Sequence, residues 1–192
     1  DVQSMNNSNT GIAGTLQRFT SQTGAFRLAR KYFPESRPDL IEEIRNMGFL
    51  ESVKIEGREL EIVPEGPVDM RKSLLAHLMD LTVREQDETT GRVFREIGEF
   101  LAVVWKETEY ILQTGLNTRF LFGRLVKVNR CFELMKEGAK VREADLVLTA
   151  ADSEMAFTPL MKALDADPNY TVAQFGQAIG AVYFANLGIL RS

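Results

Sequence analysis

Residues 93–127 read VFREIGEFLAVVWKETEYILQTGLNTRFLFGRLVK and contain the order of elements on which the predicted fold depends. The first part predicts one long buried helix, because apolar side chains recur three and four residues apart. The expected buried residues are Phe94, Ile97, Phe100, Leu101, Val104, Trp105, Ile111 and Leu112. Gly98 and Ala102 lie four residues apart, so we expect a neighbouring backbone to approach this helix closely there.

The helix is expected to end at Thr114 and Gly115, because a glycine readily adopts the left-handed conformation that ends many helices. Residues 120–122 are apolar, are too few for a helix and precede Gly123, so they predict a short strand. The order of helix, turn, strand and glycine is typical of an α/β layer, in which ligands bind beyond the carboxyl ends of the strands.

The composition is that of an ordinary globular protein, with 44% hydrophobic and 26% charged residues among 192. A net charge of −4 leaves no excess of lysine and arginine to displace counterions, so we expect no direct binding of nucleic acid. No apolar run reaches the about 18 residues of a membrane span, and no signal peptide is apparent. Together with a single cysteine, Cys131, these features predict a cytoplasmic protein.

A flexible polar segment is predicted for residues 1–10, which read DVQSMNNSNT. Because four residues precede Met5, we expect the chain to be a piece of a longer protein. The remainder, residues 11–192, is predicted to be a single α/β domain, helix-rich, with a small sheet packed by long helices. No repeat of fixed period and no linker divides it.

Before the long helix, the sequence predicts two helices and a hairpin. The helices are expected at residues 16–32, ended by Pro34, and from Pro38 to Gly48. Residues 53–62 alternate apolar and charged side chains around a glycine, which indicates a hairpin, with a helix as the alternative.

The next segments alternate helices with one more strand. A helix is expected at residues 68–84, and Asp87, Thr89 and Thr90 are candidate caps for the long helix that follows it. Later predictions are a helix from residue 128 that ends at Gly138, a strand at residues 145–149, and helices at residues 153–164 and 172–186.

Residues 11–32, GIAGTLQRFTSQTGAFRLARKY, resemble the zinc-motif segment of the ROK family of sugar kinases and repressors. In that family the pattern Cys-x-Cys-Gly-x-x-Gly-Cys-x-Glu runs into a helix, and Gly11 and Gly14 fall on its two glycines. Gln17 takes the place of the acidic residue, which is a sugar contact in the family. The three cysteine positions are occupied by Ser8, Thr10 and Thr15. We therefore expect no zinc.

Three later segments resemble the same family in the same order. They are GEFLA in the long helix at residues 98–102, RFLFGRLVK in the strand and adenosine-side glycine loop at residues 119–127, and FGQAIGAVYFA in the terminal helix at residues 175–185. The run of glycines that the family tends to have in its adenosine-side loop is reduced here to Gly123.

The resemblance implies the C-terminal lobe of a sugar kinase with the ribonuclease-H or actin-like ATPase fold. The intact parent would phosphorylate a sugar with ATP and magnesium, or would be a sugar-responsive regulator derived from such a kinase, and would form a homo-oligomer. The Asp-x-Gly phosphate loop and the catalytic Asn-Asp pair of such kinases do not occur in this chain. We therefore expect the chain to lack catalysis without its missing N-terminal lobe, because positioning and electrostatic clamping supply the catalysis.

The resemblance assigns Gly123, Arg124 and Gly180 to nucleotide binding and Gln17 to sugar binding, with no catalytic and no metal-binding residue. Each assignment has a structural alternative. Gly123 and Arg124 would then be a strand end with a solvated arginine, Gly180 would serve helix packing, and Gln17 would be an exposed polar residue.

His77 and Cys131 are the remaining candidates for chemistry, and the sequence favours structural roles for both. His77, the only histidine, lies among leucines and is expected to pair with Asp80. Cys131 has no activating neighbour in the sequence, so we expect a buried, inert thiol rather than a nucleophile.

The competing class is a non-enzymatic helical interaction or scaffold domain. Parallel strands at residues 120–126 and 145–149, with the helices at 93–113 and 171–186 packed on them, would favour the kinase lobe. An all-helical bundle would exclude it.

Overall fold

The computed structural model describes residues 12, 15–48, 51–55, 58–62, 68–121 and 123–150. The chain divides into two compact units, which are described separately here. The helical unit comprises Asp1–Asn117 and Val128–Leu146, and the strand unit comprises Thr118–Lys127 and Val147–Ser192. The prediction of one domain over residues 11–192 stays a prediction.

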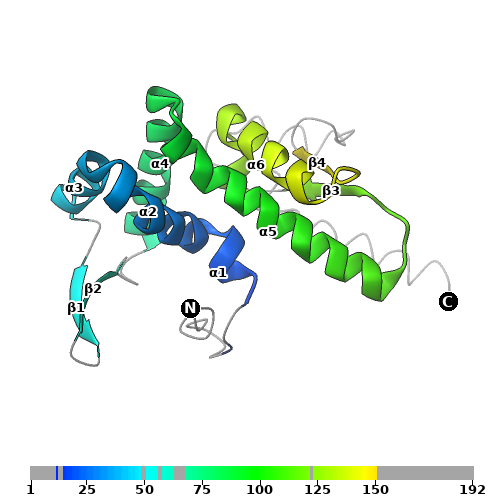
Figure 1. Ribbon diagram of the computed structural model, residues 1–192, viewed down its shortest axis with the longest axis horizontal. Helices are drawn as coiled ribbons and strands as arrows, with labels where there is room; N and C mark the ends of the chain where they lie inside the picture. Colours follow the sequence, from blue (N-terminus) through cyan, green and yellow to red (C-terminus); the bar gives the residue numbers. More distant parts are fainter. Residues whose placement is uncertain are drawn as a thin grey trace, which may run out of the picture. The chain divides into compact units, whose positions relative to one another are not determined.

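Figure 1 shows the order of the elements along the chain. Those of the helical unit are α1 (Gln17–Thr20), α2 (Gln22–Ser36), α3 (Pro38–Asn46), β1 (Glu51–Ile55), β2 (Arg58–Ile62), α4 (Val68–Glu85), α5 (Glu88–Leu112) and α6 (Asn129–Arg142). Those of the strand unit are β3 (Thr118–Leu121), the 3-10 helix η2 (Arg124–Val126) and β4 (Val147–Ala150). Among the residues described here, no helix is long and apolar enough to cross a membrane.

Helix α5 is the central element of the helical unit and packs against α1, α2, α4 and α6 (Figure 1). Its N-cap is Asp87, one of the three predicted candidates, whose side chain accepts a hydrogen bond from the Thr90 backbone N–H at 2.8 Å. The helix therefore begins at Glu88, directly after this cap, and continues to Leu112 through the stretch that was predicted to be helical.

The prediction that Gly115 ends this helix in the left-handed conformation is wrong. The residue that leaves the helix is Gln113, with φ +52°, and its backbone N–H bonds to the Glu109 carbonyl at 2.8 Å. Gly115 has φ +68° but lies two residues further on. Glutamine tolerates the left-handed conformation less well than glycine does. The hydrogen bond of the Gln113 backbone N–H compensates for part of that cost.

The buried stripe of α5 covers only the first half of the helix. Phe94 and Ile97 are fully buried, as the helical spacing predicts, and Val93 and Ala102, which were not in the expected list, are at most 1% exposed. The other expected residues in the middle of the helix are only half-buried: Phe100, Leu101, Val104 and Trp105. The list of expected buried residues also included Ile111 and Leu112, and there it is wrong. Both lie in the last turn and are more than 60% exposed.

The backbones of α5 and α6 pack closely against each other, and the close approach expected at Gly98 is confirmed. A side-chain carbon added there would lie 1.9 Å from the Met135 carbonyl oxygen, and one added at Gly138 would lie 1.9 Å from the Arg95 carbonyl oxygen. Gly138 thus lies inside α6, which continues to Arg142, and the prediction that it ends this helix is wrong. The glycine is there because α5 leaves no space for a side chain.

Pro34 likewise lies inside a helix that it was predicted to end. Helix α2 begins after Ser21, whose side chain accepts a hydrogen bond from the Thr23 N–H, and continues past Pro34 to Ser36. A proline removes one backbone donor and disturbs the turn that precedes it. The helix ends two residues later, and the Arg37 N–H closes it by bonding to the Phe33 carbonyl at 2.8 Å.

The predicted hairpin and the next helix are confirmed. Strands β1 and β2 pair antiparallel, with Glu51 opposite Ile62 and Ile55 opposite Arg58. Helix α4 covers the predicted residues 68–84 and buries a stripe that includes Leu74, Leu78 and Leu81.

In the strand unit, β3 and β4 pair in parallel, with Thr118 opposite Val147 and Leu121 opposite Ala150. Both predicted strands are confirmed, within one or two residues at their ends. The fold is therefore helix-rich α/β with a small parallel sheet. The helices predicted at 153–164 and 172–186 lie outside the described residues.

Candidate functional site

Gly123 lies directly beyond the carboxyl end of β3, where the sequence predicts a nucleotide-binding loop. Its φ of +104° and ψ of −171° belong to a conformation that residues with a side chain rarely adopt. A side-chain carbon built there would meet nothing within 4 Å, so the space beside the backbone is open. The glycine is therefore required by the path of the chain and leaves the backbone accessible.

Arg124 follows at the start of η2 and is exposed. The carboxyl ends of parallel strands lie at one edge of a sheet, so Gly123 and Arg124 occupy the edge at which α/β sheets bind ligands. An exposed backbone with a guanidinium beside it can approach a planar or anionic ligand closely.

The described structure does not test the other two predicted site residues. Gln17 is the first residue of α1 in the helical unit, and its side chain is outside the described part. Gly180 also lies outside the described residues. Their assignments to the sugar and the nucleotide stay predictions.

His77 lies on α4 and contacts α3 instead of its predicted partner. Its Nε2 is 3.3 Å from Oε1 of Glu43, without the geometry of a hydrogen bond, and Asp80 pairs with Arg84 at 2.8 Å. The prediction of Asp80 as the partner is wrong, because α3 places a closer carboxylate against α4. The contact joins two helices, in agreement with a structural role.

Cys131 lies in the first turn of α6 and is fully buried. Burial raises the pKa of its thiol to about 12, against a weaker opposing effect of Arg130. The thiol is therefore protonated at neutral pH, which agrees with the predicted inert cysteine.

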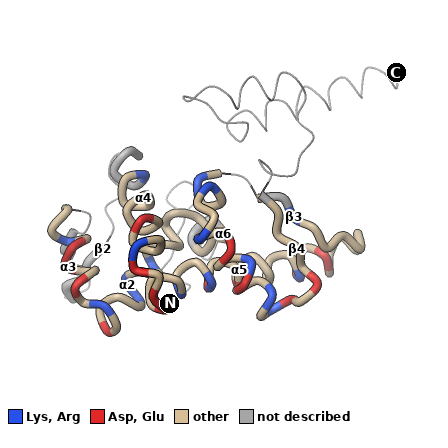
Figure 2. Tube along the Cα trace, turned by 90° about the horizontal axis from the view of Figure 1, so that it is seen from above, with Lys and Arg blue, Asp and Glu red and all other residues tan. Residues whose placement is uncertain are grey.

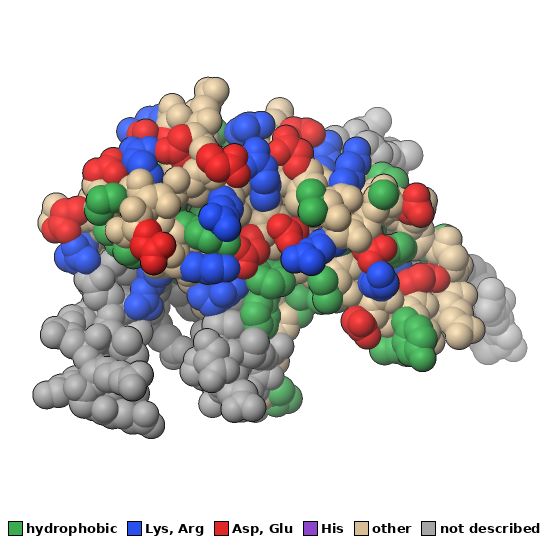
Figure 3. Space-filling model, viewed as in Figure 1, with side chains coloured by type: hydrophobic (Ala, Val, Ile, Leu, Met, Phe, Trp, Pro, Cys, Tyr) green, Lys and Arg blue, Asp and Glu red, His purple; other side chains and the backbone are tan. Residues whose placement is uncertain are grey.

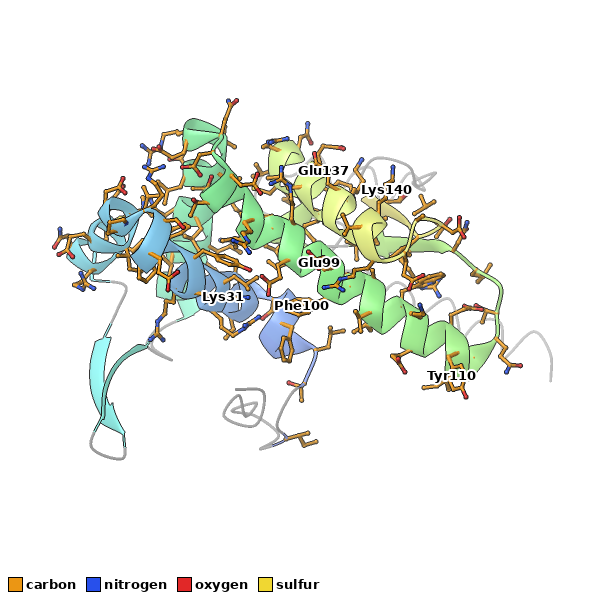
Figure 4. All side chains as sticks on the ribbon, viewed as in Figure 1. Lys31, Glu99, Phe100, Tyr110, Glu137 and Lys140 are labelled. Carbon is orange, nitrogen blue, oxygen red and sulfur yellow. The ribbon has the colours of Figure 1, made fainter. Side chains whose placement is uncertain are left out.

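The helical unit has a charged hollow that the sequence did not indicate. It has a volume of about 450 Å³ and lies between α2, α5 and α6. Figure 4 labels Lys31 on α2 with Glu99 and Phe100 on α5, all of which line it. The other lining residues are Tyr32, Glu88, Arg92, Arg95, Glu96, Val103 and Arg142.

Three of the cations that line the hollow are neutralised by carboxylates. Lys31 Nζ lies 3.1 Å from Glu96, which also accepts a hydrogen bond from the Tyr32 hydroxyl. The other two pairs are Arg95 Nη1 with Glu88 at 2.7 Å and Arg142 Nε with Glu99 at 2.7 Å. Figure 2 shows the same mixing of both signs of charge along the helices.

Two arginines beside the hollow have no carboxylate partner among the described residues. Arg92 places its guanidinium carbon 4.3 Å from the centre of the Tyr32 ring. Arg27 lies against two phenyl rings, 5.2 Å from the centre of Phe19 and 5.5 Å from that of Phe100. Burial lowers the pKa of Arg27, and the charge of Glu96 acts against that effect.

The sequence contained only part of the signal for this cluster. Arg27 and Lys31 are four residues apart on α2, as are Arg92 and Glu96 on α5, so each helix has a charged face at helical spacing. The two faces are more than 60 residues apart in the chain, and only the packing of α2 on α5 joins them.

Within the described part of the chain, no three His, Cys, Asp or Glu side chains are grouped so that they could hold a metal ion. Comparison with known protein families, with curated proteins and with solved structures finds no match for the chain.

Proposed function

We propose that the chain is the C-terminal lobe of a ROK-like, ATP-dependent sugar kinase or of a sugar-responsive regulator derived from one. It contributes to the nucleotide and sugar cleft and requires an N-terminal lobe for catalysis. A cytoplasmic location and a homo-oligomeric parent are parts of this proposal. The observation that supports it is the parallel pairing of β3 with β4, with Gly123 and Arg124 directly beyond the carboxyl end of β3.

Each of these two residues has a distinct role in the proposal. The open backbone at Gly123 lets a nucleotide approach the chain, because no side-chain carbon intervenes. Arg124 stacks on the adenine ring or pairs with an oxygen of the nucleotide through its planar guanidinium. ATP with magnesium supplies the phosphoryl group, and the phosphate loop and the base for that transfer belong to the missing lobe.

The test is calorimetric titration of the chain, and of its longer parent, with ATP and magnesium. Arg124→Ala removes a charge-assisted contact of about 1.5–3 kcal/mol, so we expect at least tenfold weaker ATP binding. Lys127→Ala is the matched control, because it removes the same charge three residues further on and should change the affinity less than threefold. Equal weakening by both substitutions, or none by Arg124→Ala, would contradict the proposed role of Arg124.

A non-enzymatic interaction domain is the second candidate. The observation that favours it is the apolar last turn of α5, where Tyr110 is 79% and Ile111 is 73% exposed. Failure of both the chain and its parent to bind ATP or a sugar would favour this candidate and would exclude the kinase lobe.

A further inference from the structure

The boundary between α2 and α5 carries an uncompensated positive charge. Arg27 and Lys31 of α2 both interact with Glu96 of α5, and Arg92 of α5 lies over the Tyr32 ring of α2. Lys31 and Arg92 share the Tyr32 ring, at 4.8 Å and 4.3 Å from its centre. Four cations and three carboxylates line the hollow, and with Arg27 beside it the local charge is +2 in a protein whose net charge is −4.

Arg27 is the group with the least satisfied environment in this cluster. Its Nε and Nη2 are buried, and within the described part of the chain they donate no hydrogen bond. Buried donors of a charged group without an acceptor are costly, and native structures seldom keep them unless water, a ligand or an ion completes the site. Glu96 accepts hydrogen bonds from Lys31 and Tyr32, and these two donors of Arg27 make none to it.

The position of the Arg92 side chain leaves it available to a ligand. An arginine that lies over an aromatic ring has its face covered and its orientation fixed, while the N–H groups at its edge can still donate hydrogen bonds. Arg92 is exposed and lines the hollow of about 450 Å³, which has room for a small anion. The carboxylates Glu88 and Glu99 on the same wall are each bound to an arginine, which reduces their repulsion of an anion.

We propose that this hollow binds a phosphate-bearing small molecule through Arg92 and Lys31, with the positive charge of Arg27 beside it. The ligand class follows from charge, because a phosphate dianion matches the local excess of +2 and has enough oxygens for both cationic donors. Figure 3 shows Lys and Arg side chains, with Asp and Glu side chains among them, on the face where α2 meets α5. The site lies in the helical unit and does not involve Gly123 or Arg124 of the strand unit, so it is independent of the proposed kinase function.

Inorganic phosphate is the probe for the test. The protein is titrated with phosphate at constant ionic strength while the side-chain Nε–H signals of its arginines are recorded by nuclear magnetic resonance. We expect saturable shifts of the Arg27 and Arg92 signals. Arg92→Ala should weaken binding at least tenfold, and Arg92→Lys should weaken it less, because it keeps the charge and loses the planar fork.

Arg130→Ala is the matched control, since Arg130 is an exposed arginine of α6 that lies 3.8 Å from the carboxylate of Glu137. It should leave phosphate affinity within twofold of that of the unaltered protein. Lys31→Ala gives a second reading at an exposed lysine, with at least a threefold loss expected. The proposal is overturned if phosphate does not bind saturably, if Arg92→Ala binds as the unaltered protein does, or if succinate binds as tightly as phosphate.

Discussion

At the scale of single residues, Gly98 and Gly138 fix how α5 meets α6. Each glycine faces a backbone carbonyl of the other helix, so the two positions are reciprocal. The close approach also buries Phe94 and Ile97 of α5 and Leu134 of α6 without any exposed surface. The two glycines therefore determine the packing of the most buried part of the helical unit.

Gly98→Ala tests this contact. The added methyl group would lie 1.9 Å from the Met135 carbonyl oxygen, so the helices must separate, and we expect the free energy of unfolding in urea to fall by about 1–3 kcal/mol. Gly91→Ala on the same helix is the control, because the nearest atoms there are at an ordinary 3.5 Å. It should be neutral or stabilise by up to about 1 kcal/mol through helix propensity. Equal losses in both variants would show that Gly98 has no special contact.

At the scale of elements, the junction of α4 and α5 is tied to the junction of α2 and α3. Arg37, between α2 and α3, donates to Asp39 at 2.7 Å and to Glu85 at 3.1 Å, and it also contacts Asp87. Asp87 is at the same time the N-cap of α5. One guanidinium thus joins two helix boundaries that are about 50 residues apart in the chain.

Asp87 provides the test of this link. Asp87→Ala removes both the cap and the partner of Arg37, so we expect a loss of about 1–2 kcal/mol in urea unfolding at pH 7. Asp87→Asn keeps a capping oxygen and loses the charge, so it should cost less. Identical losses in the two variants would mean that the cap contributes nothing.

The same residue gives a pH dependence of known sign. Burial acts to raise the pKa of Asp87, but the Thr90 backbone N–H and Arg37 outweigh it, and the pKa is lowered. A lowered pKa means that the charged side chain stabilises the fold above the unfolded pKa of about 3.9, and that this stability is lost as the pH falls through the folded value. The difference in stability between the unaltered protein and Asp87→Asn should therefore shrink on acidification below pH 4.

At the scale of the whole molecule, burial within the helical unit is uneven. The first half of α5 and the middle of α6 are buried on the surfaces where they meet. In contrast, Leu16 at the start of α1 is 39% exposed, and α1 has only four residues. Local opening should therefore require much more free energy in α5 and α6 than in α1.

Amide hydrogen exchange followed by mass spectrometry checks this ranking. We expect peptides from residues 93–102 and 131–139 to exchange most slowly among the described helices, and peptides from residues 17–20 to exchange fastest. Equal protection of α1 would contradict the ranking and would mean that α1 opens only together with the rest of the helical unit.

The sequence by itself determined the elements of this protein wherever local chemistry sets them. Periodicity identified α4 and the buried half of α5, alternation identified the β1–β2 hairpin, and the candidate caps included Asp87. Each of these depends on side chains close together in the chain, so a single segment contains the whole signal.

Only the tertiary structure decided the positions that depend on a neighbour from elsewhere in the chain. Gly138 looked like a helix end and is a contact with α5, Pro34 looked like a stop and lies within α2, and His77 meets Glu43 of α3. Arg27 and Lys31 meet Glu96, and Arg92 meets the Tyr32 ring, because α2 packs on α5. The physical reason is the same for all these contacts. Their energies depend on the distance between two segments that are far apart in the chain, and the local sequence does not specify that distance.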